Sequence, residues 1–135
     1  MKLSKESLME IAKEAGKGAY APYSDFCVGA ALLCSDGKVY TGCNIENASF
    51  TPTCCAERVA VFKAVSEGQR EFRAIAVYGQ KTGETAKECY PCGVCRQVLS
   101  EFCSDDFVVI TADADAVNES TLGELLPKSF NLTRN

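Results

Sequence analysis

The chain has 135 residues, of which 47% are hydrophobic and 24% charged, and its 14 basic and 18 acidic side chains leave a net charge of -4. It contains nine cysteines and no histidine, which excludes imidazole bases, zinc ligand sets that include histidine, and imidazole pH switches. This composition is typical of one globular domain, residues 1–135, whose chemistry must use thiols, carboxylates or a metal.

The N-terminal segment carries Glu6, Glu10 and Glu14 and lacks the uninterrupted apolar run of a secretion signal. No stretch approaches the ~18 consecutive apolar residues of a membrane span, and a pI near 4.9 predicts no basic surface for nucleic acid. We therefore expect a cytoplasmic protein that binds neither membranes nor nucleic acid. Thiols stay reduced in the cytoplasm, so the cysteines are expected to be metal ligands and buried small residues rather than disulfides.

A helix and a strand pair are predicted in the first half of the chain. From a plausible cap at Ser4, apolar residues recur at helical spacing until Gly16 and Gly18 weaken the pattern and Pro22 ends it. The apolar segments 26–34 and 38–45 flank Asp36-Gly37, and Asp-Gly is a strong signal for a hairpin turn. We expect these two strands to pair in antiparallel fashion.

The second half alternates helices over 54–67, 92–102 and 121–126 with strands over 72–79, 107–111 and, weakly marked, 116–120. Gly68 is placed to close the first of these helices. The run 72–79 is almost continuously apolar, as expected of a strand that is covered on both faces. This order predicts an α/β fold, a single-domain mixed sheet of about five strands covered by helices.

Two fragments place thiols at the first turn of a predicted helix, Cys55-Ala56-Glu57 and Pro91-Cys92-Gly93-Val94-Cys95. Cys92 and Cys95 lie three residues apart on one helix face, where the helix dipole favours their thiolates. Cys55 begins the other helix in the same way. Three protein ligands with an open fourth position are typical of a catalytic rather than a structural Zn²⁺. We predict Cys55, Cys92 and Cys95 as the ligands.

Glu57 is the candidate proton carrier. In the middle of a helix, side chains two residues apart point in different directions, so Cys55 and Glu57 can converge only at the helix entrance. A carboxylate that is not itself a ligand can take a proton from a metal-activated water and deliver it elsewhere. Glu57 is therefore predicted to act first as general base and then as general acid.

These fragments resemble the zinc deaminases, in which one ligand precedes the proton-carrying Glu by two residues and a P-C-x-x-C follows downstream. The chain is similar to the small homotetrameric cytidine deaminases in YSDFCVGAAL (23–32), TGCNIENAS (41–49), CAERVA (55–60), PCGVCRQ (91–97) and TLGELLP (121–127). The resemblance implies hydrolytic deamination of cytidine and deoxycytidine to uridine and deoxyuridine, one Zn²⁺ per subunit, and a homotetramer with shared sites.

The resemblance also implies roles for single residues. Phe26 matches the aromatic that stacks on the pyrimidine, and Asn44 and Glu46 match the side chains that bind the ribose. The backbone N–H of Ala56 matches the group that holds the ring carbonyl. Phe130 resembles an aromatic that reaches into a neighbouring subunit, so that the active site would be complete only in the oligomer.

Arg58 is the candidate for charge compensation. Three thiolates leave the zinc cluster with a net negative charge, which makes the metal a weaker Lewis acid than one with a neutral ligand. Arg58 lies three residues after Cys55 and can donate hydrogen bonds to thiolate sulfur, as in the three-Cys members of the family that the chain resembles. The N-termini of the two helices add partial positive charge on the same side.

Simpler interpretations stay open for these residues. Cys54 or Cys89 would convert the cluster to a closed structural zinc site if either supplied a fourth ligand. Phe26 and Phe130 would also suit hydrophobic packing, and the polar pair in NIEN (44–47) would suit a turn. The cysteines outside the predicted ligand set are expected to be packing residues, and they are Cys27, Cys34, Cys43, Cys54, Cys89 and Cys103.

Other functions compete with nucleoside deamination. A related enzyme would act on an aminopyrimidine antibiotic of the blasticidin kind, or on cytosine within a polynucleotide. The net negative charge and the absence of Trp argue against the polynucleotide, and the NIENAS segment favours the nucleoside enzyme over the antibiotic enzyme. A non-catalytic zinc-binding module is the alternative from another class, and it would have no need for Glu57.

Overall fold

The computed structural model describes residues 3–132. Its helices are α1 (Lys5–Ala15), the 3-10 turn η1 (Gly16–Gly18), α2 (Ala56–Ser66), α3 (Gly93–Phe102) and α4 (Leu122–Leu125). Its strands are β1 (Phe26–Cys34), β2 (Val39–Cys43), β3 (Phe72–Lys81), β4 (Val108–Ala112) and β5 (Val117–Thr121). The predicted α/β class and mixed sheet are confirmed, including the weakly marked strand before α4.

The five-stranded sheet has the order β2-β1-β3-β4-β5. β1 pairs in antiparallel fashion with both β2 and β3, β3 and β4 are parallel, and β4 and β5 are antiparallel. The predicted hairpin turns at Gly37, whose φ is 94°, and Asp36 Oδ1 accepts a hydrogen bond from the backbone N–H of Lys38. A positive φ favours glycine, because other side chains clash with the backbone there.

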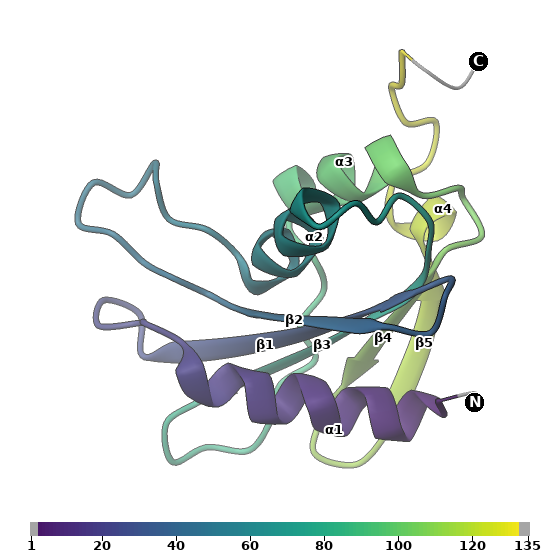
Figure 1. Ribbon diagram of the computed structural model, residues 1–135. Coiled ribbons are helices and arrows are strands. Elements are labelled where there is room, and N and C mark those ends of the chain that lie inside the picture. The colour runs from purple at the N-terminus through teal and green to yellow at the C-terminus, as the bar shows by residue number, and fades with distance from the viewer. Residues whose placement is uncertain (1–2, 133–135) are drawn as a thin grey trace.

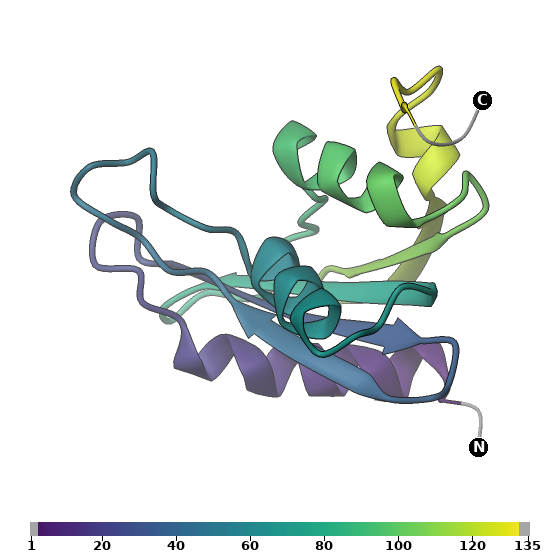
Figure 2. The same ribbon diagram turned by 45° about the horizontal axis from the view of Figure 1, so that its top comes forward.

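Helices cover both faces of the sheet (Figures 1 and 2). α1 packs on one face, and α2 and α3 lie on the other. Along β3, Ile75 and Val77 are buried in the cluster beneath α2 and α3, whereas Ala74 and Ala76 are buried in the cluster beneath α1. The predicted burial of the strand 72–79 on both faces is therefore confirmed in β3. No helix within residues 3–132 is both long and apolar enough to cross a membrane.

Gly42 allows α2 to pack unusually close to β2. A Cβ atom at this position would lie 2.2 Å from the carbonyl oxygen of Ala56 and 2.6 Å from the backbone nitrogen of Ala60. These distances are shorter than van der Waals contact, so the first turns of α2 sit against bare backbone. This close approach sets the height above the sheet at which α2 begins.

Candidate active site

The predicted thiols and carboxylate lie at the N-termini of α2 and α3. Cys55 is the N-cap of α2 and has an extended backbone, and Glu57 lies in the first turn. Cys92 is the N-cap of α3, where its sulfur accepts a hydrogen bond from the N–H of Cys95 at 3.5 Å. The helix predicted over 54–67 begins two residues later, at Ala56. Cys55 and Glu57 thus lie at a helix entrance, and the Cys55 thiol is near enough to act electrostatically on the Glu57 carboxyl.

The sulfurs of Cys55, Cys92 and Cys95 lie within 4.8 Å of one another. The distance from Cys92 Sγ is 3.7 Å to Cys55 Sγ and 3.5 Å to Cys95 Sγ. A tetrahedral Zn²⁺ with Zn–S bonds of about 2.3 Å holds its sulfurs about 3.8 Å apart, so the cluster fits this ion. Cys54 and Cys89 lie outside the cluster, which disfavours a closed four-thiol site within the described chain.

Arg58 lies beside the sulfurs and donates a hydrogen bond from Nη2 to Cys55 Sγ at 3.5 Å. Hydrogen bonding from Cys95, and then from Arg58, lowers the pKa of Cys55 to about 5. The Nε atom of Arg58 is buried without a hydrogen-bond partner among the described residues. Cys55 is thus favoured as the thiolate, the form in which cysteine binds a metal, whereas its hydrogen bond with Cys95, followed by burial, raises the pKa of Cys95.

Glu57 is almost completely buried, with 4% of its surface exposed. Burial, followed by the nearby Cys55 thiol, raises the pKa of Glu57 to about 7. A buried carboxyl whose pKa lies close to neutral can both accept and release a proton, which is what a general base and acid must do. Its burial in the first turn of α2 distinguishes Glu57 from glutamates on the surface, which are exposed to solvent.

Phe26 lies at the start of β1, and its ring covers a position without a side chain. A Cβ atom built on Gly79 would lie 2.7 Å from Phe26 Cζ and 3.0 Å from Cys89 Cβ. The ring therefore rests on the backbone of β3 at Gly79. Phe26 is also packed against the cluster of buried residues beneath α2 and α3, and its stacking role stays a prediction.

Asn44 holds the beginning of β1 in place. Its Oδ1 accepts a hydrogen bond from the N–H of Val28 at 2.9 Å, and its Nδ2 donates one to the carbonyl of Phe26 at 2.9 Å. One N–H of the amide is left for a ligand. The predicted contact with ribose stays a prediction, and Asn44 has in addition a structural role that the sequence pattern does not reveal.

Glu46 holds the loop before β1. Its Oε1 accepts hydrogen bonds from the N–H groups of Tyr23 at 3.0 Å and Ser24 at 3.2 Å, and its Oε2 accepts one from the Ser24 hydroxyl. The Ser24 hydroxyl, followed by these backbone groups, lowers the pKa of Glu46. The carboxylate is thus ionised at neutral pH, as a partner for sugar hydroxyls should be, while its role toward ribose stays a prediction.

A cavity of about 390 Å³ lies beside Glu46 and is lined by Tyr23, Ser24, Glu46, Asn47, Phe50 and Thr53. Phe50 is 76% exposed, and nothing in its sequence pattern marks it as a functional residue. A larger hollow of about 750 Å³ lies on the α1 face and includes none of the predicted site residues. Of these two hollows, we connect the one beside Glu46 with function, because it is lined by a predicted site residue.

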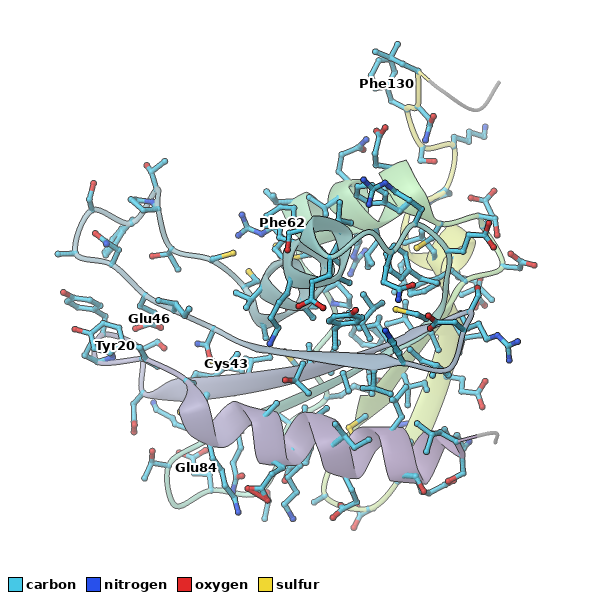
Figure 3. All side chains as sticks on the ribbon, viewed as in Figure 1. Tyr20, Cys43, Glu46, Phe62, Glu84 and Phe130 are labelled. Atoms are coloured by element: carbon cyan, nitrogen blue, oxygen red, sulfur yellow. The ribbon has the colours of Figure 1, made fainter. Side chains whose placement is uncertain are left out.

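Phe130 lies apart from the other predicted site residues. Figure 3 shows it at the tip of the C-terminal segment, at the opposite side of the molecule from Glu46 and Tyr20. It is 70% exposed, and Gln97 Nε2 donates a hydrogen bond to its carbonyl at 3.0 Å. Within one chain, Phe130 and the predicted ribose ligand Glu46 are not brought together.

Three convergent thiols, a buried carboxyl and a compensating guanidinium at two helix N-termini are the parts of a catalytic zinc centre on an α/β sheet. Residues 2–111 match the family described as the cytidine and deoxycytidylate deaminase zinc-binding region. The chain belongs to this family of zinc deaminases, and its three clustered thiols are grouped as a zinc site requires.

Relatives and solved structures agree with this assignment over almost the entire chain. A cytidine deaminase of Sporosarcina psychrophila is 48% identical over 126 residues, which are 93% of this chain and 90% of the relative. One of Halalkalibacterium halodurans is 48% identical over 129 residues, 95% of either chain. The crystal structure of a cytidine deaminase from Burkholderia pseudomallei superposes with a TM-score of 0.86 at 46% identity, covering 95% of this chain and 100% of that one.

Proposed function

We propose that this chain catalyses the hydrolytic deamination of cytidine and deoxycytidine to uridine and deoxyuridine, with release of ammonia. The observation that carries this proposal is the juxtaposition of the three-thiol cluster with the buried Glu57 at the entrance of α2. A zinc-binding module without catalysis has no use for a buried carboxyl at that point. The cytidine deaminases that are 48% identical to the chain support the same substrates.

The residues of the site divide the work of the reaction. Bound Zn²⁺ supplies a Lewis acid that lowers the pKa of water and so provides a nucleophile at neutral pH. Glu57 takes the first proton from the attacking water and places it on N3 of cytosine as the C4–O bond forms. It then takes the remaining proton from the hydroxyl added at C4 and passes it to the amine, so that the C4–N bond breaks, ammonia leaves and the C4 carbonyl forms. Because Glu57 is buried, these protons are moved out of contact with bulk water. Arg58 offsets the charge of the thiolates.

The remaining predicted residues position the nucleoside. The N–H of Ala56 is at the first position of α2, where backbone donors have no partner within the helix, and it holds the ring carbonyl. Phe26 stacks on the pyrimidine, while Asn44 and Glu46 bind the ribose hydroxyls. A free base lacks those hydroxyls and would leave the polar groups unpaired, so the site selects nucleosides.

We also propose that residues 1–135 act as one catalytic domain in a cytoplasmic homotetramer whose sites are shared between subunits. The exposure of Phe130, far from Glu46 in its own chain, supports this arrangement, because an exposed aromatic side chain can enter the site of a neighbouring subunit. The net charge of -4 supports a small-molecule substrate rather than nucleic acid.

A spectrophotometric assay tests the proposal with cytidine, deoxycytidine, cytosine, cytidine monophosphate and blasticidin S, each with and without a chelator. We expect turnover of the two nucleosides and its loss after zinc removal. Glu57→Gln should keep its zinc and lose activity by several orders of magnitude, whereas the exposed Glu101→Gln should match the wild type. Zinc-loaded wild-type protein that turns over neither nucleoside would refute the proposal, and turnover of blasticidin S alone would identify the antibiotic enzyme.

A further inference from the structure

Glu88 lies in the loop between β3 and α3 and accepts hydrogen bonds from three side chains. Its Oε2 accepts one from Thr111 Oγ1 at 2.9 Å and one from Asn118 Nδ2 at 2.7 Å, and its Oε1 accepts one from the Tyr90 hydroxyl at 2.9 Å. These donors lower the pKa of Glu88. The carboxylate has no part in the reaction proposed above, and it lies four residues before Cys92.

Two of these donors belong to the sheet. Thr111 on β4 is 0% exposed, and Asn118 is its cross-strand partner on β5. A buried hydroxyl that loses its acceptor costs the free energy of its desolvation, so the Thr111 contact holds the loop firmly. One carboxylate thus ties the loop before Cys92 to a pair of strands whose relative position is set by their backbone hydrogen bonds.

The loop has further anchors on either side of Glu88. The N–H of Lys87 donates to the carbonyl of Gly79 at 3.1 Å. Arg96 Nε donates to the carbonyl of Pro91 at 2.7 Å, and Arg96 Nη1 donates to the carbonyl of Leu125 at 2.6 Å. The chain that leads into Cys92 is therefore fixed to the sheet at one end and to the start of α3 at the other.

Cys92 depends on this loop more than the other two thiols do. Cys95 lies inside α3 and is 0% exposed, so packing holds its sulfur, and Cys55 is half-buried. Cys92 is exposed and precedes the first residue of α3. Burial does not hold Cys92, so its position is set on one side by the first turn of α3, where the N–H of Arg96 donates to the Cys92 carbonyl at 2.9 Å, and on the other side by the preceding loop.

We propose that Glu88 is a positioning residue for the zinc site, which holds Cys92 Sγ at its place in the thiol cluster by tying the loop to β4 and β5. The inference rests on the proposed zinc-dependent function of the cluster. It predicts that loss of the carboxylate weakens the hold on zinc, because residues that orient ligands typically contribute about tenfold to a hundredfold in metal affinity.

The rate at which the zinc-loaded protein releases its metal to an excess of a chromophoric chelator tests the proposal. Glu88→Ala should release zinc about tenfold faster than the wild type. Glu88→Gln keeps an oxygen for Thr111 and Asn118 and offers its amide to Tyr90, so its rate should stay close to that of the wild type. A wild-type rate in Glu88→Gln would show that the hydrogen bonds of residue 88, and not its negative charge, slow the release of zinc.

Asp36→Ala is the matched control. Asp36 is also an exposed carboxylate with a lowered pKa, and it accepts hydrogen bonds from Gln69 Nε2 at 2.9 Å and from the N–H of Lys38 at 3.0 Å. It lies in the β1–β2 turn, at the opposite end of β1 from Phe26. The variant should lower the melting temperature without changing the rate of zinc release.

Zinc release from Glu88→Ala at the wild-type rate would overturn the proposal, as would an equal acceleration in Asp36→Ala. If Glu88→Ala does not fold, Asn118→Ala replaces it, since it removes one donor from the exposed edge strand. That variant should accelerate release by a smaller factor, and a wild-type rate would again overturn the proposal. None of these measurements uses deamination, so a zinc-loaded wild type without turnover would refute the proposed function and leave this inference intact.

Discussion

The guanidinium of Arg58 donates a hydrogen bond to the sulfur of Cys55, with 3.5 Å between Nη2 and Sγ. The two residues are one helical turn apart, because Cys55 is the N-cap of α2 and Arg58 lies in its first turn. Through this hydrogen bond Arg58 favours the thiolate form of Cys55. This contact within one helical turn places the positive charge of Arg58 next to the negative charge of the thiolates.

Arg58→Ala should lower both zinc affinity and turnover, each by about tenfold to a hundredfold, because the thiolates lose their hydrogen bond and their compensating charge. Arg58→Lys should retain part of both, since it keeps the charge but not the planar guanidinium. Zinc content by elemental analysis and steady-state kinetics measure the effects. Zinc content and turnover in Arg58→Ala that both match the wild type would contradict this role.

Cys54 and Cys55 should differ sharply in their effect on zinc binding. Cys54 lies outside the sulfur cluster, and its backbone pairs with Ile45 through two hydrogen bonds of 2.9 Å. Cys54→Ser should therefore keep one zinc per chain, whereas Cys55→Ser should lose most of it. Elemental analysis of the purified proteins measures the stoichiometry. A loss of zinc from Cys54→Ser would show that a second thiol of this loop takes part in ligation.

Gly42→Ala should destabilise the fold by about 3 kcal/mol, because the added methyl group meets the backbone of α2 rather than a flexible side chain. Gly18→Ala is the matched control, since its Cβ would lie 3.7 Å from Cys43 Sγ, an ordinary contact. Urea unfolding of the three proteins gives the free energies. A Gly42→Ala protein as stable as Gly18→Ala would show that α2 can move away from the sheet at little cost.

The contribution of Asp36 to stability should depend on pH. Hydrogen bonds from Gln69 and then from the Lys38 N–H lower its pKa below the ordinary value of about 3.9. A carboxyl with a depressed folded-state pKa stabilises the fold above its unfolded pKa and loses this contribution as the pH falls through the folded value. Wild type should be more stable than Asp36→Asn at pH 6, and the difference should vanish at lower pH.

The difference in unfolding free energy between the wild type and Asp36→Asn is measured with urea at a series of pH values from about 6 down to 3. Both proteins carry the same thiols, so the loss of zinc in acid affects them equally and cancels in the difference. A difference that stays constant over this range would contradict the predicted titration of Asp36.

Most elements of the fold were predictable because their signals are local. The apolar run 72–79 and the Asp36-Gly37 turn each depend on neighbouring residues alone, and the structure contains the corresponding strand and hairpin. The weak signal at 116–120 has a physical reason, since β5 is an edge strand that alternates poorly between buried and exposed residues. Backbone pairing with β4 makes it a strand, and sequence periodicity does not report such pairing.

The end of the first helix depended on tertiary structure. Its pattern predicts a helix that Gly16 and Gly18 weaken and Pro22 ends, and α1 ends at Ala15 and continues only as the turn η1. A Cβ atom at Gly29 would lie 1.9 Å from the carbonyl oxygen of Ala12 and 2.4 Å from the nitrogen of Gly16. The end of α1 is thus pressed against the backbone of β1, a contact between segments that are distant in the sequence.

The sequence by itself determined the chemistry of this protein, because the absence of histidine, the spacing of Cys92 and Cys95, and the placement of Cys55 and Glu57 at a helix entrance are local properties. Only the tertiary structure decided what Asn44 and Glu46 hold in place and how Glu88 fixes the loop before Cys92. These relationships join residues from different strands and loops. They arise where the fold places strands and loops from distant parts of the chain side by side, which no pattern within a single segment encodes.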